Sequence, residues 1–259
     1  MAANVAKRVL VVAGAGNGSG TGAATARLFA KNGYHVALIA RGADSLNKVS
    51  EEINAAGGQA APFPLKSYSH EDIATTWAAI HERFPKPEYE VRAAVWNAGH
   101  GVWKPFLDIT PTDVQECLDT SVAAAFAFAR HSILAFKENE IDPTNGKRGA
   151  LIFTGATASI RGNVVTSAFS AAKHGARALS QSLAKEFGKQ NIHVSHAIID
   201  GGILTDRWRA MKASDPSSIT DDNVRLRPES IAESYLYLVN QDNSSWTWEL
   251  DLRPAHEKW

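Results

Sequence analysis

Three features are scarce or missing in the 259-residue sequence: cysteine, an excess of one charge, and long apolar runs. The single cysteine, Cys117, can form no internal disulfide, and residues 1–8 lack the apolar stretch of a signal peptide. We therefore expect a reducing, cytoplasmic location. No stretch approaches the roughly 20 apolar residues that span a bilayer, so we expect no membrane helix. No spacing of Cys and His predicts a zinc site, and we expect no bound metal.

The charge is balanced, with 27 Lys and Arg against 27 Asp and Glu. The basic residues are scattered among acidic ones, as on an ordinary solvated surface. This pattern argues against the broad basic footprint with which proteins bind nucleic acid or anionic lipid. With 44% hydrophobic residues, the chain can bury one sizeable core, and we expect a single domain over residues 1–259.

Short apolar runs alternate with helix-forming segments along the chain. The predicted strands are residues 8–13, 35–40, 59–64, 91–96, 149–154, 192–198 and 247–252. The predicted helices are residues 23–31, 43–56, 70–84, 112–136, 166–187 and 228–239. This alternation predicts an α/β protein whose seven-stranded, mostly parallel sheet carries helices on both faces. Right-handed crossovers make it a three-layer, doubly wound Rossmann fold.

One long segment, residues 206–225, interrupts this alternation directly after a predicted strand. It mixes Trp208 and Met211 with Asp, Ser and Pro. Ligands of doubly wound proteins bind over the carboxyl ends of the strands. We therefore interpret residues 206–225 as a substrate lid, with an ordinary surface loop as the alternative.

A cluster of glycines, Gly14-x-x-x-Gly18-x-Gly20, joins the first predicted strand to the first helix. Without side chains at these positions, backbone amides at the start of the helix can approach a pyrophosphate. A flexible glycine-rich turn is the alternative, but the strand before and the helix and strand after favour a dinucleotide site. Asn17 and Ser19, within the loop, are counted among the cofactor-binding residues.

The second predicted strand is followed by Arg41. An acidic residue at this place would accept hydrogen bonds from the adenosine ribose, whereas Arg41 can form a charge-assisted pair with a 2′-phosphate. NADP(H) is therefore favoured over NAD(H). The alternative is a solvated arginine at the start of a helix.

The order of three motifs resembles that of the short-chain dehydrogenase/reductase family over essentially the whole chain. They are Ala13-Gly14-x-x-x-Gly18-x-Gly20, Trp96-Asn97-Ala98-Gly99 and Asp200-Gly201-Gly202-Ile203-Leu204-Thr205. The resemblance implies that Asn97, Ala98 and Gly99 border the cofactor, and that the Ile203 backbone and the Thr205 hydroxyl hold the nicotinamide amide. Where the family often has an Asp at the adenine, this chain has Lys66 or Ser67, and we count Ser67 as cofactor-binding.

The catalytic motif of that family is only partly present. The family uses Tyr-x-x-x-Lys, a Ser thirteen residues before the Tyr, and an Asn on the preceding long helix. Here Phe169 stands at the Tyr position, Ala156 at the Ser position and Ser121 at the Asn position, and only Lys173 is retained. Its spacing puts Lys173 on the helix face of Phe169, where it can reach the ribose hydroxyls, unless it is a plain surface lysine. A missing general acid typically costs 10² to 10⁴ in rate.

Other residues can supply the missing proton. His100 follows the Asn97 turn, and Asp200 stands at the start of the loop of residues 200–205, so both are candidate acids, although the structural interpretation as an ordinary polar group is favoured for each. Ser121 offers a hydroxyl. Trp103, Phe169 and Trp208, with Ala156, are expected to line the substrate pocket.

We expect an NADP(H)-dependent oxidoreductase that delivers hydride to an imine, iminium or activated C=C or C=O of a small hydrophobic molecule. The alternative is a related protein that binds a nucleotide or metabolite without redox turnover, as a sensor, partner subunit or isomerase scaffold. A third hypothesis is ordinary ketone chemistry with His100 or Asp200 as the acid. The resemblance also implies a homodimer or homotetramer formed through the two long helices.

Overall fold

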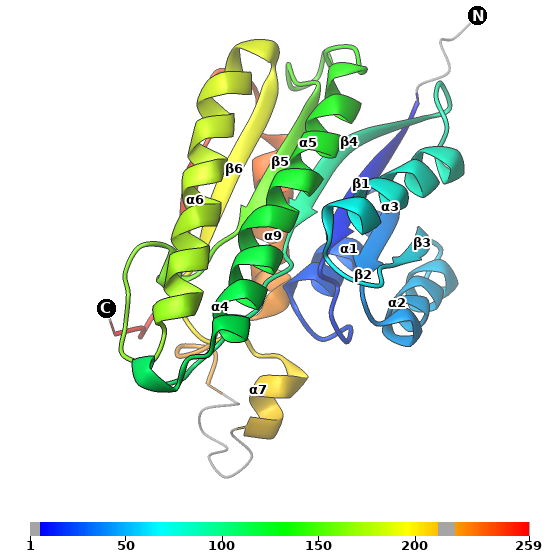
Figure 1. Ribbon diagram of the computed structural model, residues 1–259. Helices are drawn as coiled ribbons and strands as arrows, with labels where there is room; N and C mark the ends of the chain where they lie inside the picture. The colour runs from blue at the N-terminus through cyan, green and yellow to red at the C-terminus, as the bar shows by residue number, and fades with distance from the viewer. Residues whose placement is uncertain (1–5, 212–220, 259) are drawn as a thin grey trace, which may run out of the picture.

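A seven-stranded sheet forms the middle layer of the computed structural model, which describes residues 6–211 and 221–258 (Figure 1). The strands are β1 Lys7–Ala13, β2 His35–Ala40, β3 Gln59–Pro64, β4 Tyr89–Trp96, β5 Gly149–Thr154, β6 Ile192–Ile199 and β7 Glu249–Leu252. Their order is β3-β2-β1-β4-β5-β6-β7, and every neighbouring pair is parallel. The predicted doubly wound Rossmann fold is confirmed.

Helices cover both faces of the sheet because successive side chains of the buried strands point in opposite directions. In β1, Val9 and Val11 pack into one core cluster and Leu10 and Val12 into the other. The helices of the first cluster are α3 His70–Arg83, α5 Ala124–Lys137 and α6 Ser167–Phe187; those of the second are α1 Thr21–Lys31, α2 Ala43–Ala55 and α9 Pro228–Asn240. Figure 1 shows α5 and α6 in front of the sheet and α9 behind it.

The helix predicted over residues 112–136 is not continuous. It begins as α4 Pro111–Leu118, passes through a π-helical turn at Asp119–Ala123 and continues as α5. Thr110 accepts a hydrogen bond from the Asp113 backbone, and the Asp113 side chain accepts one from the Thr110 backbone, which caps the start. The π turn adds a residue to one turn, and apolar spacing does not reveal it because every residue keeps a helical conformation.

The strand order reverses between β1 and β4, and the crevice at this point opens over the carboxyl ends of the strands. Of the predicted lid, residues 206–211 form the short helix α7 Asp206–Met211, while residues 212–220 lie outside the described residues. In the described part of the chain, no helix has both the length and the apolar character needed to cross a bilayer.

Candidate functional site

A cavity of about 960 Å³ lies over the carboxyl ends of the strands. Its lining includes the glycine loop after β1, Trp103 and residues of α7. Most of the predicted site residues line it: Gly14, Asn17, Gly20, Asn97, Gly99, Trp103, Ala156, Phe169, Lys173, Asp200, Ile203, Thr205 and Trp208. This volume is at the upper end for ligand pockets and has room for a dinucleotide's reactive half together with a second molecule.

The glycine loop is pressed against the turn that follows β4. Gly14 has φ +95°, and a Cβ there would lie 2.6 Å from the Ala98 backbone nitrogen. The Asn97 side chain donates a hydrogen bond of 2.8 Å to the Gly14 carbonyl. Gly16, by contrast, lines the cavity and has no atom within 4 Å of the position where a Cβ would be. The loop is therefore held from behind while its open side faces the cavity, as a site for a pyrophosphate requires.

Helix α7 is attached to this loop by three polar residues. Ser19 Oγ donates to Asn17 Oδ1 at 2.7 Å, and Asn17 Nδ2 donates to Asp206 Oδ2 at 3.3 Å. The Asp206 backbone donates to Ser19 Oγ at 3.1 Å. The beginning of the predicted lid thus places a carboxylate beside the loop. No sequence pattern indicates this contact, because the partners lie 187 and 189 residues apart.

The adenosine end is less enclosed. The Arg41 guanidinium lies over the Tyr68 ring, 5.4 Å from its centroid, and Arg41 is exposed and outside the cavity lining. Ser67 is also outside the lining, and its hydroxyl donates to Asp72 Oδ2 at 2.7 Å, near the start of α3. Ser67 is thus engaged with a helix start, whereas Arg41 remains accessible at the end of β2.

Lys173 lies inside the wall of the cavity, one helical turn after Phe169. It is 7% exposed, and its Nζ donates to the Thr154 carbonyl at 2.9 Å. The same nitrogen is 5.9 Å from the Phe169 ring centroid. Burial lowers the pKa of Lys173 to about 8. A surface role for Lys173 is therefore excluded, and the lysine can hold or release a proton near neutral pH.

Phe169 packs on Trp103, with ring centroids 5.3 Å apart, so the tyrosine position is part of an aromatic wall. Ala156 lines the cavity, and its methyl group offers no hydrogen bond. Ser121 lies in the π-helical turn, is 1% exposed and is not part of the lining. Its hydroxyl has no hydrogen-bond partner among the described residues.

The side chain of His100 is not brought into the cavity, although its neighbours Gly99 and Gly101 line it. His100 Nε2 lies 3.2 Å from Glu116 Oε2 on α4. Its carboxylate partner, Glu116, is also outside the cavity lining. This placement does not support His100 as the acid.

Asp200 lines the cavity, but its carboxylate is saturated. It is 1% exposed and accepts a hydrogen bond of 2.5 Å from Thr157 Oγ1. Arg161 and Arg253 approach it at 3.2 Å and 3.4 Å. The Thr157 hydroxyl and the two guanidiniums therefore use the Asp200 carboxylate as a hydrogen-bond acceptor, which does not support Asp200 as the acid.

The loop of residues 200–205 is held by a parallel bridge between Ile203 and Leu226. Thr205 Oγ1 accepts a hydrogen bond of 3.2 Å from the Trp208 backbone, at the start of α7. Ile203, Thr205 and Trp208 all line the cavity. Sequence reasoning missed Arg161 and Arg207 in the same lining, because neither belongs to a recognisable motif.

Comparisons with known proteins agree with this geometry. The family model "short chain dehydrogenase" matches residues 7–215. Dehydrogenase/reductase SDR family member 11 of Gallus gallus is 25% identical and aligns over 96% of this chain and 97% of its own length. The 3alpha-hydroxysteroid dehydrogenase of Mediterraneibacter gnavus is 28% identical over 91% of each chain.

Solved structures show the same fold. A short-chain dehydrogenase from Rhodopseudomonas palustris superimposes with a TM-score of 0.76 at 29% identity, over 96% of this chain and 99% of that one. A metagenomic short-chain oxidoreductase solved in complex with NADP gives a TM-score of 0.75 at 22% identity, over 97% and 99%. On the match of the family model, the chain belongs to the short-chain dehydrogenase family.

Proposed function

We propose that the protein is an NADP(H)-dependent oxidoreductase that transfers hydride to an imine, an iminium or an activated C=C or C=O of a small hydrophobic molecule. The proposal rests on a contrast within one cavity, between the retained cofactor-binding residues and the replaced proton donors. The glycine loop, Asn97 and Lys173 are arranged to hold a nicotinamide nucleotide, while Phe169 and Ala156 leave the acceptor without the family's proton donor.

The residues present fit NADP(H). Gly16 and the start of α1 line the cavity where a pyrophosphate would bind, and Ile203 and Thr205 line it where they would hold the nicotinamide amide. Arg41, accessible at the end of β2, is the residue for a 2′-phosphate. Bound there, the cofactor would supply a hydride. Lys173 would hold the ribose hydroxyls with an Nζ already oriented by the Thr154 carbonyl.

The class of acceptor is inferred from the side chains in the cavity that can donate a proton. The titratable side chains of the described lining are Arg161, Lys173, Asp200, Arg207, Glu257 and Lys258. Of these only Lys173 is both buried and next to Phe169, and burial lowers its pKa to about 8. An iminium needs no proton at the reacting carbon or nitrogen, and an activated double bond needs less help than a plain ketone. The aromatic wall of Phe169 and Trp103 suits such a flat, apolar acceptor.

The test is steady-state hydride transfer with a cyclic imine, an enone and a plain ketone of matched size. We expect NADPH oxidation with the imine or the enone, at least a hundredfold faster than with the ketone, with label passing from deuterated NADPH to the product. Tight NADPH binding with no transfer to any acceptor would overturn the proposal and favour the non-redox binding alternative.

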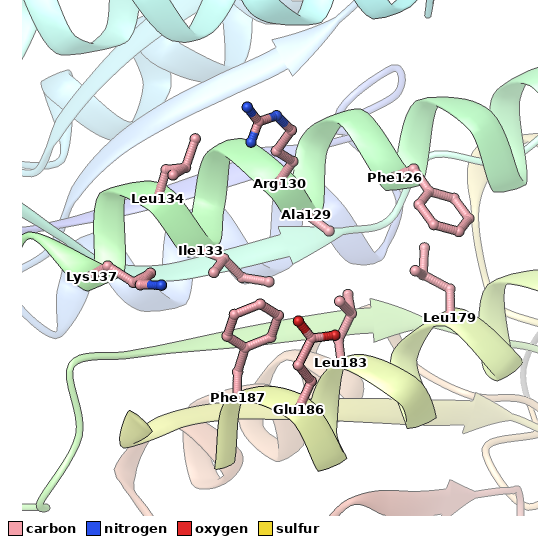
Figure 2. A pocket seen from close by; sticks show the side chains of 10 residues that line it. All are labelled: Phe126, Ala129, Arg130, Ile133, Leu134, Lys137, Leu179, Leu183, Glu186 and Phe187. Carbon is pink, nitrogen blue, oxygen red and sulfur yellow. The ribbon is translucent and has the colours of Figure 1, made fainter. Parts of the chain in front are cut away.

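We also propose that the protein is a homodimer or homotetramer. Figure 2 shows side chains of α5 and α6 facing a groove of about 330 Å³. Phe126 is 56% exposed and Leu134 44% exposed, and Arg130 and Glu186 border the groove with opposite charges that a second copy can pair. Light scattering after gel filtration should give twice or four times the chain mass, and Leu134→Glu should reduce it to one chain.

The free thiol of Cys117 fits the expected cytoplasmic location.

A further inference from the structure

Two arginines line the acceptor half of the cavity, and the proposed cofactor site uses neither of them. Arg161 lies in the loop after β5, and Arg207 lies in α7. The described lining contains four cationic side chains, Arg161, Lys173, Arg207 and Lys258, against two anionic ones, Asp200 and Glu257. The acceptor therefore meets an excess of positive charge.

Arg207 supplies a charge that is not compensated within the described residues. Its guanidinium lies over the ring of Trp103, 5.9 Å from the centroid, and no carboxylate among the described residues pairs with it. Trp103 in turn packs on Phe169. The neighbouring Asp206 contacts the glycine loop instead, so these two residues of α7 have different partners. The charge of Arg207 is thus on the acceptor side.

Arg161 supplies directed donors. Among the described residues only its Nη2 is engaged, by the Asp200 carboxylate at 3.2 Å and 3.4 Å, and its side chain is 36% exposed. Its Nε and Nη1 make no hydrogen bond with the described residues. Asp200 balances the charge of Arg161 but leaves these donors free. The cavity therefore combines a charged guanidinium, a second guanidinium with open donors, and an aromatic wall.

We propose that the acceptor is a carboxylic acid whose flat, unsaturated body carries the reducible C=N, C=C or C=O bond and packs on Trp103 and Phe169, while its carboxylate binds Arg207, with Arg161 as a second donor. Planar guanidiniums match carboxylates in geometry and charge, and the Arg207 guanidinium lies over the Trp103 ring, 5.9 Å from its centroid. This assignment names the substrate class of the proposed oxidoreductase and rests on that function.

Isothermal titration of the NADPH-saturated protein with two probes of equal shape, naphthalene-2-carboxylate and naphthalene-2-carboxamide, tests the assignment. We expect the carboxylate to bind at least tenfold more tightly than the amide. Arg207→Gln should reduce this ratio to below about threefold, and Arg161→Gln should reduce it to a smaller extent. Arg83→Gln, an exposed arginine of α3, changes the net charge equally and should leave the ratio unchanged.

Equal affinity for the two probes, or binding of neither, would overturn the assignment. So would a loss of NADPH affinity in Arg207→Gln, because this arginine would then belong to the cofactor site. The proposed function is tested separately by hydride transfer: preference for the carboxylate without any NADPH oxidation would refute the oxidoreductase and leave the anion site in place. Hydride transfer to neutral acceptors with no preference for acids would support the oxidoreductase and refute the anion site.

Discussion

Phe169→Tyr is expected to convert the protein into a ketone reductase. The substitution adds one oxygen to a ring that already lines the cavity, one helical turn before Lys173. The Lys173 nitrogen lies 5.9 Å from the ring centroid. The new oxygen would lie roughly 6 Å from this nitrogen, where a unit charge contributes about 3 kcal/mol at an effective dielectric constant near 20. This attraction lowers the pKa of the new phenol towards neutrality, where a general acid works best.

A positioned general acid contributes roughly 10² to 10⁴ in rate, or about 3 to 5 kcal/mol of barrier. Ala156 still offers no hydroxyl to orient a carbonyl, so we expect the lower end: about a hundredfold increase in kcat/KM for a ketone. Adding Ala156→Ser should raise it further. For a preformed iminium, which needs no proton, kcat/KM should change by less than about threefold.

The assay is NADPH oxidation followed by nicotinamide absorbance, with NADPH affinity measured separately by fluorescence. Phe106→Tyr is the matched control, because Phe106 is 75% exposed and is not part of the cavity lining. The reasoning would be refuted if Phe169→Tyr left ketone reduction unchanged with cofactor affinity intact. It would also be refuted if the unmodified protein reduced ketones as fast as imines.

Three further outcomes are expected. If Lys173 donates the proton to an activated carbonyl or enone, the rate should be highest below pH 8 and fall about tenfold per pH unit above it, because Lys173, with a pKa of about 8, loses that proton. Lys173→Met should abolish this fall in rate. A pH-independent rate in the unmodified protein would contradict Lys173 as the proton donor. Asp206→Asn removes a carboxylate beside the glycine loop, so NADPH should bind roughly two- to fivefold more tightly, whereas exposed Asp222→Asn should have no effect. Tyr235→Phe removes a buried 2.8 Å hydrogen bond to Thr154, so it should lower the free energy of unfolding by about 1 to 3 kcal/mol and Tm by roughly 2 to 10 °C. Thermal melts measure this change, and Tyr237→Phe is the control because Tyr237 is exposed.

Local patterns predict the elements well where one short segment carries the signal. The strand β1 and the glycine loop depend on an apolar run and on residues that allow positive φ, as at Gly14, and these are properties of neighbouring residues. The π-helical turn at Asp119–Ala123 is not predictable in this way, because its residues join α4 to α5 with the helical backbone conformation retained.

The candidate site divides in the same way. The positions of Phe169 and Lys173 follow from spacing on one helix, and their shared face is predictable. The environment of Asp200 is not, because its partners Thr157 and Arg161 are 43 and 39 residues away in the sequence. The sequence therefore offers Asp200 as an acid, whereas its packing makes it an acceptor.

By itself, the sequence determined the alternating strands and helices, the glycine loop, and the replacement of three catalytic side chains, because each depends on residue types within a short stretch of the chain. Only the tertiary structure decided that His100 pairs with Glu116, that Asp206 reaches the glycine loop, and that the Arg207 guanidinium lies over the Trp103 ring. The physical reason is that a charged side chain interacts strongly only with partners within a few ångströms, and folding determines which partners lie that close. In this protein those partners meet at the carboxyl ends of strands that are distant in the sequence.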